Sequence, residues 1–300
     1  MNKVDKCFYC GSQSLAVLVR ASDFMITGEE FSVVRCISCS FAFTNPRPDD
    51  NDIGRYYQSE DYISHNDQAK GLMGFLYRFV RKYMLRKKCL LLTKILPDKK
   101  EPKLLDYGCG TGEFLARARR EGFRTFGVEP DKNARTQAKE KGLYIADSLN
   151  QLANRSKIKK FDIITLWHVL EHIPDINQIL IKFNDILPPD GLIVVAVPEY
   201  KCYDASFYGK YWAAWDLPRH LNHFDQSSLI NWFDSNGFSP IAHYPMWYDA
   251  IYISLLSERY KKSGLFGMLR GICIGFWSNF IAFFTLRPFS SQIYVFQRKS

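Results

Sequence analysis

Short apolar runs alternate with helical patterns through the middle of the chain. Each run is rich in branched or aromatic side chains and ends at polar or turn-forming residues, which predicts a short buried strand. The expected strands are the run from Leu104 to Asp106, Arg124–Glu129, Leu143–Ala146, Phe161–Leu166 and Leu192–Val197. A helix is expected before the fifth strand, with its apolar face formed by Ile176, Ile179, Leu180, Phe183 and Leu187. Strands that alternate with helices predict an α/β fold with a largely parallel sheet.

The C-terminal part of the chain predicts two helices and then a final strand. The helices are expected at Tyr248–Lys262 and Leu265–Leu286, and Gln292–Phe296 alternates as the last strand of a sheet would. The stretch Gly271–Leu286 has no charged residue, but its sixteen residues are fewer than the ~20 that a membrane span requires. The insertion (about 248–288) is therefore expected to cap a substrate pocket, to form a dimer face or to contact a membrane at shallow depth.

Three glycines follow the first predicted strand at every second position. Gly108, Gly110 and Gly112 predict a tight turn from strand to helix that leaves backbone bare for a ligand. The dinucleotide-binding turn has the spacing G-x-G-x-x-G and exposes a helix N-terminus to a pyrophosphate. Here the spacing is G-x-G-x-G, and Asp106 lies two residues before the first glycine. A carboxylate there would repel a pyrophosphate and attract an ammonium group, which favours S-adenosylmethionine as the ligand.

Acidic residues also end the next two predicted strands. Glu129 follows Gly112 by 17 residues, a position from which a carboxylate can accept hydrogen bonds from both hydroxyls of a ribose. Asp147 and Ser148 end the third strand and suit an adenine amino group.

In this order the segments resemble the class I S-adenosylmethionine-dependent methyltransferases, over about residues 103–245. The signals are D-x-G-x-G-x-G, the acid that ends the second strand, L-E-H-I-P-D and P-P-D-G. The resemblance implies a Rossmann-like sheet of seven strands, the last one antiparallel, and methyl transfer from S-adenosyl-L-methionine. It further implies that three side chains near the end of the fourth strand belong to the cofactor site: Trp167, His168 and His172.

Four of the eight cysteines form two C-x-x-C pairs near the N-terminus. Each pair can lie on a knuckle turn with both thiolates pointing inward, and two pairs supply a tetrahedral S₄ site. The expected metal ligands are Cys7, Cys10, Cys36 and Cys39. The stretches Leu15–Arg20 and Phe31–Arg35 between them predict strands, so we expect a zinc ribbon over residues 1–48 whose metal is structural. Iron is the main alternative metal.

The residues after the fifth strand are expected to bind the methyl acceptor. Their aromatic residues are predicted either to stack on a sugar or ring acceptor or to pack on one another; they are Tyr200, Tyr203, Phe207, Tyr208, Tyr211, Trp212, Trp215 and Phe224. His223, with His220 as second choice, is the candidate general base, because histidine titrates near neutral pH. Arg219 is expected to hold an anionic group of the acceptor.

The run D-x-P-R-H-L-x-H-F at Asp216–Phe224, together with the cysteine pairs, resembles a bacterial subgroup of methyltransferases that carry a zinc ribbon. That resemblance implies a small-molecule, sugar or lipid-linked acceptor in surface polysaccharide or specialised metabolism. The sequence does not indicate whether oxygen, nitrogen or carbon is methylated, nor the oligomeric state.

The net charge of +9 is concentrated in one segment. Between Lys70 and Lys100 there are ten Lys or Arg and one acid, an excess equal to that of the whole chain. We expect a helix over Leu72–Leu96 with an apolar stripe formed by Leu72, Leu76, Phe79, Tyr83 and Leu90. Its charges either face water or attract a polyanion or an anionic membrane.

The expected organisation is a metal module at 1–48, a linker and basic helix at 49–100, and a methyltransferase domain at 101–300. Residues 51–71 are predicted to fold over the cofactor. The polar N-terminus, with no apolar run after it, predicts a cytoplasmic protein, with peripheral contact at the inner face of the membrane as a further expectation. An RNA methyltransferase and a non-catalytic S-adenosylmethionine-binding protein are the alternatives. The absence of N-P-P-Y after the fourth strand counts against methylation of exocyclic base amines, while ring-carbon or ribose methylation stays open; nucleic acid is not the expected partner.

Overall fold

The computed structural model describes residues 1–49, 52–57, 71–155 and 158–299, with the side chains of 71–79 left out. The chain divides into two compact units, each of which is described by itself. The first unit contains Met1–Ser59, His168–Ile179 and Val195–Phe296, and the second contains Glu60–Trp167, Leu180–Val194 and Gln297–Ser300. The N-terminal residues thus belong to the same unit as the segments after the fifth predicted strand. Most of the linker predicted to fold over the cofactor lies outside the described residues.

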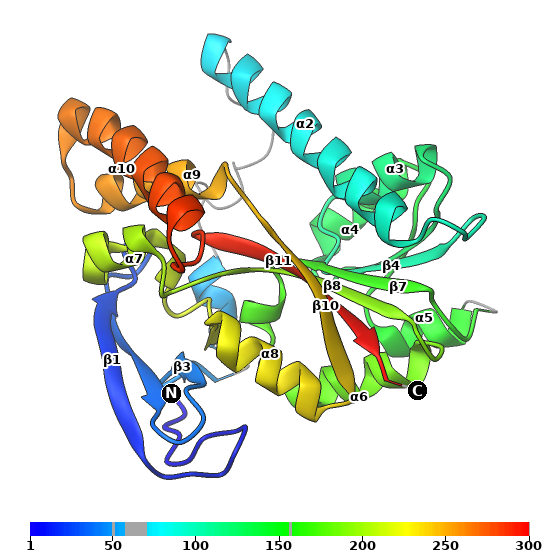
Figure 1. Ribbon diagram of the computed structural model, residues 1–300, viewed down its shortest axis with the longest axis horizontal. Helices are drawn as coiled ribbons and strands as arrows, with labels where there is room; N and C mark the ends of the chain where they lie inside the picture. The colour runs from blue at the N-terminus through cyan, green and yellow to red at the C-terminus, as the bar shows by residue number, and fades with distance from the viewer. Residues whose placement is uncertain (50–51, 58–70, 156–157, 300) are drawn as a thin grey trace. The chain divides into compact units, whose positions relative to one another are not determined.

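A seven-stranded mixed sheet has the order β10-β11-β8-β7-β4-β5-β6, with the last strand of the chain antiparallel, as the resemblance implied (Figure 1). Its strands are β4 (Lys103–Tyr107), β5 (Arg124–Val128), β6 (Tyr144–Ala146), β7 (Ile163–Trp167), β8 (Leu192–Pro198), β10 (Phe238–Pro245) and β11 (Ser291–Arg298). Each predicted strand is present with its ends moved by a few residues at most.

In the second unit, β4 pairs in parallel with β5 and β7, and β5 pairs with β6. The helices that follow these strands are α3 (Glu113–Arg120), α4 (Lys132–Glu140), α5 (Leu149–Arg155) and α6 (Ile176–Ile186). Asp131 caps α4 by accepting a hydrogen bond from the backbone N–H of Ala134 at 2.7 Å. Gly127 has no room for a side chain, because a Cβ there would lie 2.6 Å from the Cys109 sulfur. The strand β5 therefore packs closely under the glycine turn that follows β4.

The basic helix is α2 (Gly71–Ile95), which packs on α3. Its predicted apolar stripe is wrong at the positions that can be compared: Tyr83 and Leu90 are exposed, whereas Cys89 and Leu92 are buried. The error arose because a stripe drawn through the aromatic residues placed the buried face of the helix about one position out of register.

The first unit contains a second, four-stranded sheet of order β1-β2-β3-β9. Its strands are β1 (Leu15–Ser22), β2 (Glu30–Cys36), β3 (Ala42–Thr44) and β9 (Asn222–His223). All three pairings are antiparallel, and Ala42 pairs with His223. The sequence predicted β1 and β2 but neither β3 nor β9. The N-terminal sheet is therefore completed by a strand that carries the candidate general base.

The remaining elements of the first unit surround this sheet or extend from it. They are η1 (Ile53–Tyr57), η2 (Leu170–His172), α7 (Tyr203–Tyr208), η3 (Gly209–Tyr211), η4 (Ala213–Trp215), α8 (Gln226–Ser235), α9 (Asp249–Tyr260) and α10 (Gly264–Phe284). The helices α9 and α10 are the predicted insertion between β10 and β11. Among the described residues, α10 alone is long and apolar enough to cross a membrane, and a third of its most apolar stretch is buried.

The aromatic residues after β8 pack mainly on one another and on the N-terminal sheet. Tyr208, Trp212 and Trp215 form one buried cluster with Phe31 and Val33 of β2, whereas Phe207 is exposed. Of the two uses predicted for these aromatic residues, internal packing describes most of them.

Candidate functional site

The glycine turn after β4 is built from three residues in left-handed conformations. The φ angles of Gly108, Gly110 and Gly112 are 75°, 53° and 78°, a region that side chains rarely adopt. A Cβ on Gly112 would lie 2.5 Å from Leu143, but one on Gly110 would meet no atom of the described residues within 4 Å. The backbone at Gly110 thus borders open space, as a ligand-binding turn requires.

Glu129 joins this turn to the end of β5. Its Oε2 accepts a hydrogen bond from the backbone N–H of Gly110 at 2.8 Å, and its Oε1 accepts one from Asp131 at 2.9 Å. Burial raises the pKa of this carboxyl, and the two N–H donors oppose that shift. Each oxygen keeps a lone pair, so the carboxylate can still accept the ribose hydroxyls predicted for it.

Asp106 is buried at the end of β4 and accepts a hydrogen bond from the Thr165 hydroxyl at 2.6 Å. Burial raises the pKa of Asp106 to about 7, and the Thr165 hydroxyl and the Lys88 charge counter it. A bound cation would lower this pKa. Asp106 is therefore held at the end of β4, without an exposed carboxylate in this structure.

The other second-unit residues predicted to bind cofactor lie at the ends of β6 and β7. The Asp147 carboxylate accepts hydrogen bonds from the Ser148 hydroxyl at 2.8 Å and from the Gln151 amide at 2.5 Å. Trp167 lies edge-on to Phe114, and its buried indole N–H has no hydrogen-bond partner in the part of the chain that the structure describes. The strands β6 and β7 are separated by β5 and β4, which carry Glu129 and Asp106, and in open α/β sheets ligands bind at the carboxyl ends of parallel strands.

His168 and His172, also predicted to contact the cofactor, belong to the first unit. His168 has a positive φ of 56°, and its ring lies between two acids: Nε2 is 3.1 Å from Asp249 and Nδ1 is 3.4 Å from Glu171. Burial lowers the pKa of His168, but the two carboxylates outweigh it and raise the pKa to about 9. His172 Nδ1 donates to the carbonyl oxygen of Arg219 at 3.1 Å.

The two candidate bases are buried in the first unit, and their hydrogen bonds define their tautomers. Thr44 donates its hydroxyl proton to the carbonyl of His220 at 2.6 Å, so it accepts from His223 Nε2 at 3.0 Å. His220 Nδ1 donates to the carbonyl of Ala214 at 2.9 Å. The neutral rings therefore keep Nδ1 of His223 and Nε2 of His220 unprotonated, as a base must.

Burial is also the main reason that both histidines are neutral. It lowers the pKa of His220 to about 4, with the nearby charge of His172 acting in the same direction. The pKa of His223 is well below its ordinary value for the same reason, with His220 and Arg47 adding to the effect.

Glu171 is the residue of this cluster that the sequence did not single out. It is 1% exposed, and its carboxylate has the ion-pair neighbour His168 Nδ1 at 3.4 Å but no closer hydrogen bond among the described residues. Burial opposes its ionisation, but the imidazoles of His168, His220 and His172 hold its pKa below the ordinary value. One carboxylate oxygen of Glu171 lies within 4.8 Å of a ring nitrogen of His172 and of a ring nitrogen of His220. The sequence signal that could have identified Glu171 is its place directly before the histidine in the L-E-H motif.

Glu171, His220 and His223 line one small cavity of about 10 Å³, close to the room that a single water needs. Its other walls are Pro198, Tyr200, Trp212, Ala214, Asn222 and Phe224. An acceptor can reach these histidines only if part of this wall moves.

The prediction that Arg219 holds an anionic group of the acceptor is wrong. Its guanidinium is 1% exposed and donates to Asp216 at 2.7 Å and to Asp23 at 3.0 Å. It also donates to the carbonyl oxygen of Tyr56 at 2.9 Å. Both carboxylates come from within the first unit, so Arg219 fastens the histidine-bearing loop to the turn after β1.

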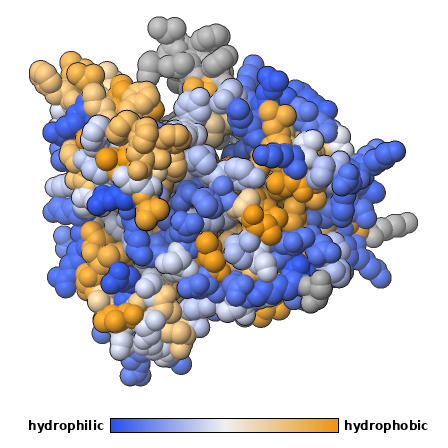
Figure 2. All heavy atoms as spheres, in the orientation of Figure 1, coloured by the Kyte–Doolittle hydropathy of each residue, from blue (hydrophilic) through white to orange (hydrophobic). Residues whose placement is uncertain are grey.

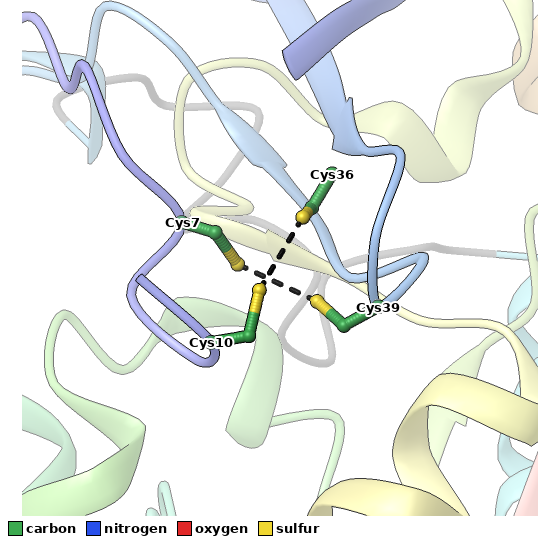
Figure 3. A group of neighbouring side chains, drawn as sticks. All are labelled: Cys7, Cys10, Cys36 and Cys39. Atoms are coloured by element: carbon green, nitrogen blue, oxygen red, sulfur yellow. Dashed lines mark hydrogen bonds between the residues drawn. The ribbon is translucent and has the colours of Figure 1, made fainter. Parts of the chain in front are cut away.

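The four N-terminal cysteines lie together as predicted (Figure 3). The sulfurs of Cys7 and Cys39 are 3.5 Å apart, as are those of Cys10 and Cys36, and all four lie within 4.8 Å. Four thiolates at the usual zinc–sulfur distance would be about 3.8 Å apart. The donor set and its spacing therefore fit a tetrahedral metal.

The two C-x-x-C turns have the same backbone design. Gly11 and Ser40 each follow the second cysteine of a pair, have positive φ angles of 74° and 64°, and donate to the carbonyl of the first cysteine at 2.9 Å. Burial raises the pKa of Cys36, but the backbone N–H of Cys39 and the thiol of Cys10 outweigh it, so that the pKa falls to about 7. These are the knuckle turns that the sequence predicted.

Comparison with known proteins places these features in one family. A family model described as a methyltransferase domain matches residues 80–243, more than half of the chain. A ubiquinone biosynthesis O-methyltransferase of Actinobacillus pleuropneumoniae is 30% identical over 148 residues, which cover 44% of this chain and 63% of that protein. The C-methyltransferase NovU of Streptomyces niveus is 27% identical over 146 residues, which cover 45% of this chain and 32% of that protein. The chain thus matches less than two thirds of the length of these relatives.

Solved structures agree on the fold. The magnesium protoporphyrin IX methyltransferase of Synechocystis, with bound S-adenosylhomocysteine, has a TM-score of 0.51 at 13% identity, over 82% of this chain and 98% of that one. The same enzyme with bound S-adenosylmethionine has a TM-score of 0.50 at 14% identity, over 85% of this chain and all of that one. At these identities the likeness concerns the fold alone. With the matching family model, it shows that the chain belongs to the methyltransferase domain family, with the class I S-adenosylmethionine-dependent fold.

Proposed function

We propose that this protein transfers a methyl group from S-adenosyl-L-methionine to a small-molecule, sugar or lipid-linked acceptor. The observation that carries the proposal is the contact between Glu129 and the N–H of Gly110 in an open glycine turn. Asp106, Glu129 and Asp147 end three neighbouring strands, as a cofactor with an ammonium, a ribose and an adenine would require. When bound, the cofactor supplies an electrophilic methyl group on sulfonium, and the protein must align an acceptor with it.

We further propose that the acceptor atom is an oxygen or a carbon that must lose a proton. The matched relatives are named for O- and C-methylation. Two neutral histidines with an unprotonated nitrogen line one cavity, a state in which they can accept that proton. We assign His223 as the base and His220 as the second choice. The ionised Glu171 would stabilise the imidazolium that forms.

The cysteine cluster is proposed to hold one structural zinc on Cys7, Cys10, Cys36 and Cys39. Four thiolates fill a tetrahedral metal and leave no position for a substrate. Zinc supplies cross-linking there and takes no part in the transfer.

Cofactor binding tests the proposal directly. Isothermal calorimetry with S-adenosylhomocysteine should give tight binding to the full chain, and Glu129→Gln should weaken it by ~10- to 100-fold, because a charged acceptor for hydroxyls is lost. Glu121→Gln is the matched control, since that acid is an exposed side chain paired with Arg117 on α3. Tight binding of NADH with no heat from S-adenosylhomocysteine would overturn the proposal.

A further inference from the structure

In α10 the usual distribution of side chains in a water-soluble protein is reversed: small or polar residues are buried and large apolar residues are exposed. Its buried face consists of small or polar residues: Gly267, Gly271, Gly275, Ser278, Asn279 and Ala282. Apart from Arg270 and Cys273, its exposed side chains are large and apolar: Leu265, Phe266, Met268, Leu269, Phe276, Trp277, Phe280, Phe283 and Phe284. Phe266 is 88% exposed and Phe284 67%. Figure 2 shows apolar residues gathered over this part of the surface.

The small residues allow α10 to pack closely on α9. A Cβ at Gly271 would lie 3.1 Å from the Cα of Leu255, and one at Gly275 would lie 2.5 Å from the Cα of Ile251. Glycines at four-residue spacing that bring two helix backbones together are typical of helices packed in a membrane, where large apolar residues face lipid.

Polar contacts fix which face of α10 points outward. Ser278 donates to Asp204 of α7 at 2.7 Å, and Asn279 donates to the carbonyl of Trp247 at 2.7 Å. Arg270 donates to both oxygens of Glu258 on α9, at 2.7 and 2.6 Å. These bonds hold the large apolar side chains on the outside of the folded unit. They also oppose spanning, because a helix that left α7 and α9 would carry unpaired polar groups into hydrocarbon.

The charges around α10 favour an anionic surface as the partner. From Arg259 to the end of the chain there is no Asp or Glu, while Lys261 and Lys262 precede α10 and Arg287 follows it. An isologous dimer through this face would bring copies of these cations toward one another. An anionic bilayer instead places lipid tails against the aromatic side chains and phosphates against the cations.

We propose that the hairpin of α9 and α10 is a membrane-docking device that lies in the plane of an anionic bilayer, with the outer face of α10 inserted among the lipid headgroups. This proposal concerns the hairpin alone and does not depend on methyl transfer. The sequence left three uses open for the insertion: a cap over a substrate pocket, a dimer face, or shallow contact with a membrane. The proposal selects membrane contact.

Flotation of the full chain tests this, with vesicles of phosphatidylcholine alone or mixed with phosphatidylglycerol. The protein should float with the anionic vesicles at low salt and much less at high salt, since salt screens the cations. Phe276→Glu/Phe280→Glu should reduce the bound fraction at least tenfold. Ile181→Glu is the matched control, because Ile181 on α6 and Phe276 on α10 are both 61% exposed. This variant should bind to the vesicles like the wild type.

Lipid depth and oligomeric state complete the test. Brominated lipids should quench the fluorescence of the wild type, and Trp277→Phe should remove most of that quenching. The proposal is overturned if the wild type stays unbound to anionic vesicles at low salt. It is also overturned if sedimentation shows a dimer without lipid that Phe276→Glu/Phe280→Glu dissociates, because the apolar face would then be an interface between copies.

Discussion

At the scale of single residues, burial determines what the acid–base groups can do. His220 and His223 were chosen from the sequence because histidine titrates near neutral pH. The structure shows that burial lowers the pKa of both rings, which leaves one nitrogen of each free to accept a proton but makes each a weaker base than an exposed histidine. For Arg219 the sequence-based assignment fails. The sequence assigned this cation to the acceptor, but in the structure it forms ion pairs with Asp216 and Asp23.

These pKa directions predict an unusual pH profile. A base with a lowered folded-state pKa is active above that pKa and loses activity as the pH falls through it, so turnover should persist below pH 6.5 and fall only at a more acidic pH. His223→Ala should lower kcat by ~10²- to 10⁴-fold with saturating cofactor. His243→Ala, on β10, is the control.

Should turnover instead fall with a midpoint near pH 6.5, the base is an exposed histidine and the assignment fails. If both His223→Ala and His220→Ala keep near wild-type kcat, the acceptor is already nucleophilic, such as an amine, and the protein acts mainly by positioning.

At the scale of elements, the short strand β9 is the feature that sequence reasoning could not supply. Two residues give no periodicity, and their strand character comes only from pairing with β3, itself three residues long. The longer strands and the helices α9 and α10 were predictable because each carries several turns or alternations of one pattern. The glycine turn and cysteine pairs were predictable because their spacing is a local geometric requirement.

The pairing of β3 with β9 connects the proposed metal site to the proposed base. Cys36→Ser should lower the bound metal to well below one equivalent per chain, measured by elemental analysis of protein purified without chelator. Because β2, β3 and β9 are consecutive in one sheet, His223 should lose its support, so that kcat falls while the affinity for S-adenosylhomocysteine changes less than threefold.

Cys89→Ser is the control for that experiment, since Cys89 is buried in α2 of the second unit and is not one of the four clustered cysteines. A variant that loses its metal yet keeps full turnover would show that the sheet holds His223 without the metal. Wild-type protein with far less than one zinc or iron per chain would refute the metal site itself.

At the scale of the whole molecule, the chain builds its first unit from three separate segments. Sequence reasoning placed a boundary at residue 48, because the turn-rich stretch there resembles a linker. No local pattern could reveal that Phe31 and Val33 of β2 pack against Trp212 and Trp215, since that contact joins residues far apart in the sequence. The α/β order of the other unit was predictable because it follows the sequence.

Deletion of residues 1–48 should therefore expose a core rather than remove an appendage. The buried cluster around Trp212 and Trp215 would lose the apolar side chains of β1, β2 and β3. We expect strong binding of an apolar dye and poor solubility, because burying one such large side chain is worth about 1.5–3 kcal/mol. The control is Cys10→Ser in the intact chain; a truncated protein that stays monomeric and binds no dye would contradict the expectation.

The first unit is built from three separate segments of the chain, which limits how recombination can change this protein during evolution. Residues 1–59, 168–179 and 195–296 form one compact unit, although the strands proposed to bind the cofactor are inserted between them. A single recombination crossover between two relatives would combine halves of different cores, with mismatched partners for β9 and for Arg219. New acceptor preferences should then arise by point substitution within a lineage, or by exchange of all three segments together. A designer who wishes to transplant the acceptor side must move the cysteine turns along with the histidines.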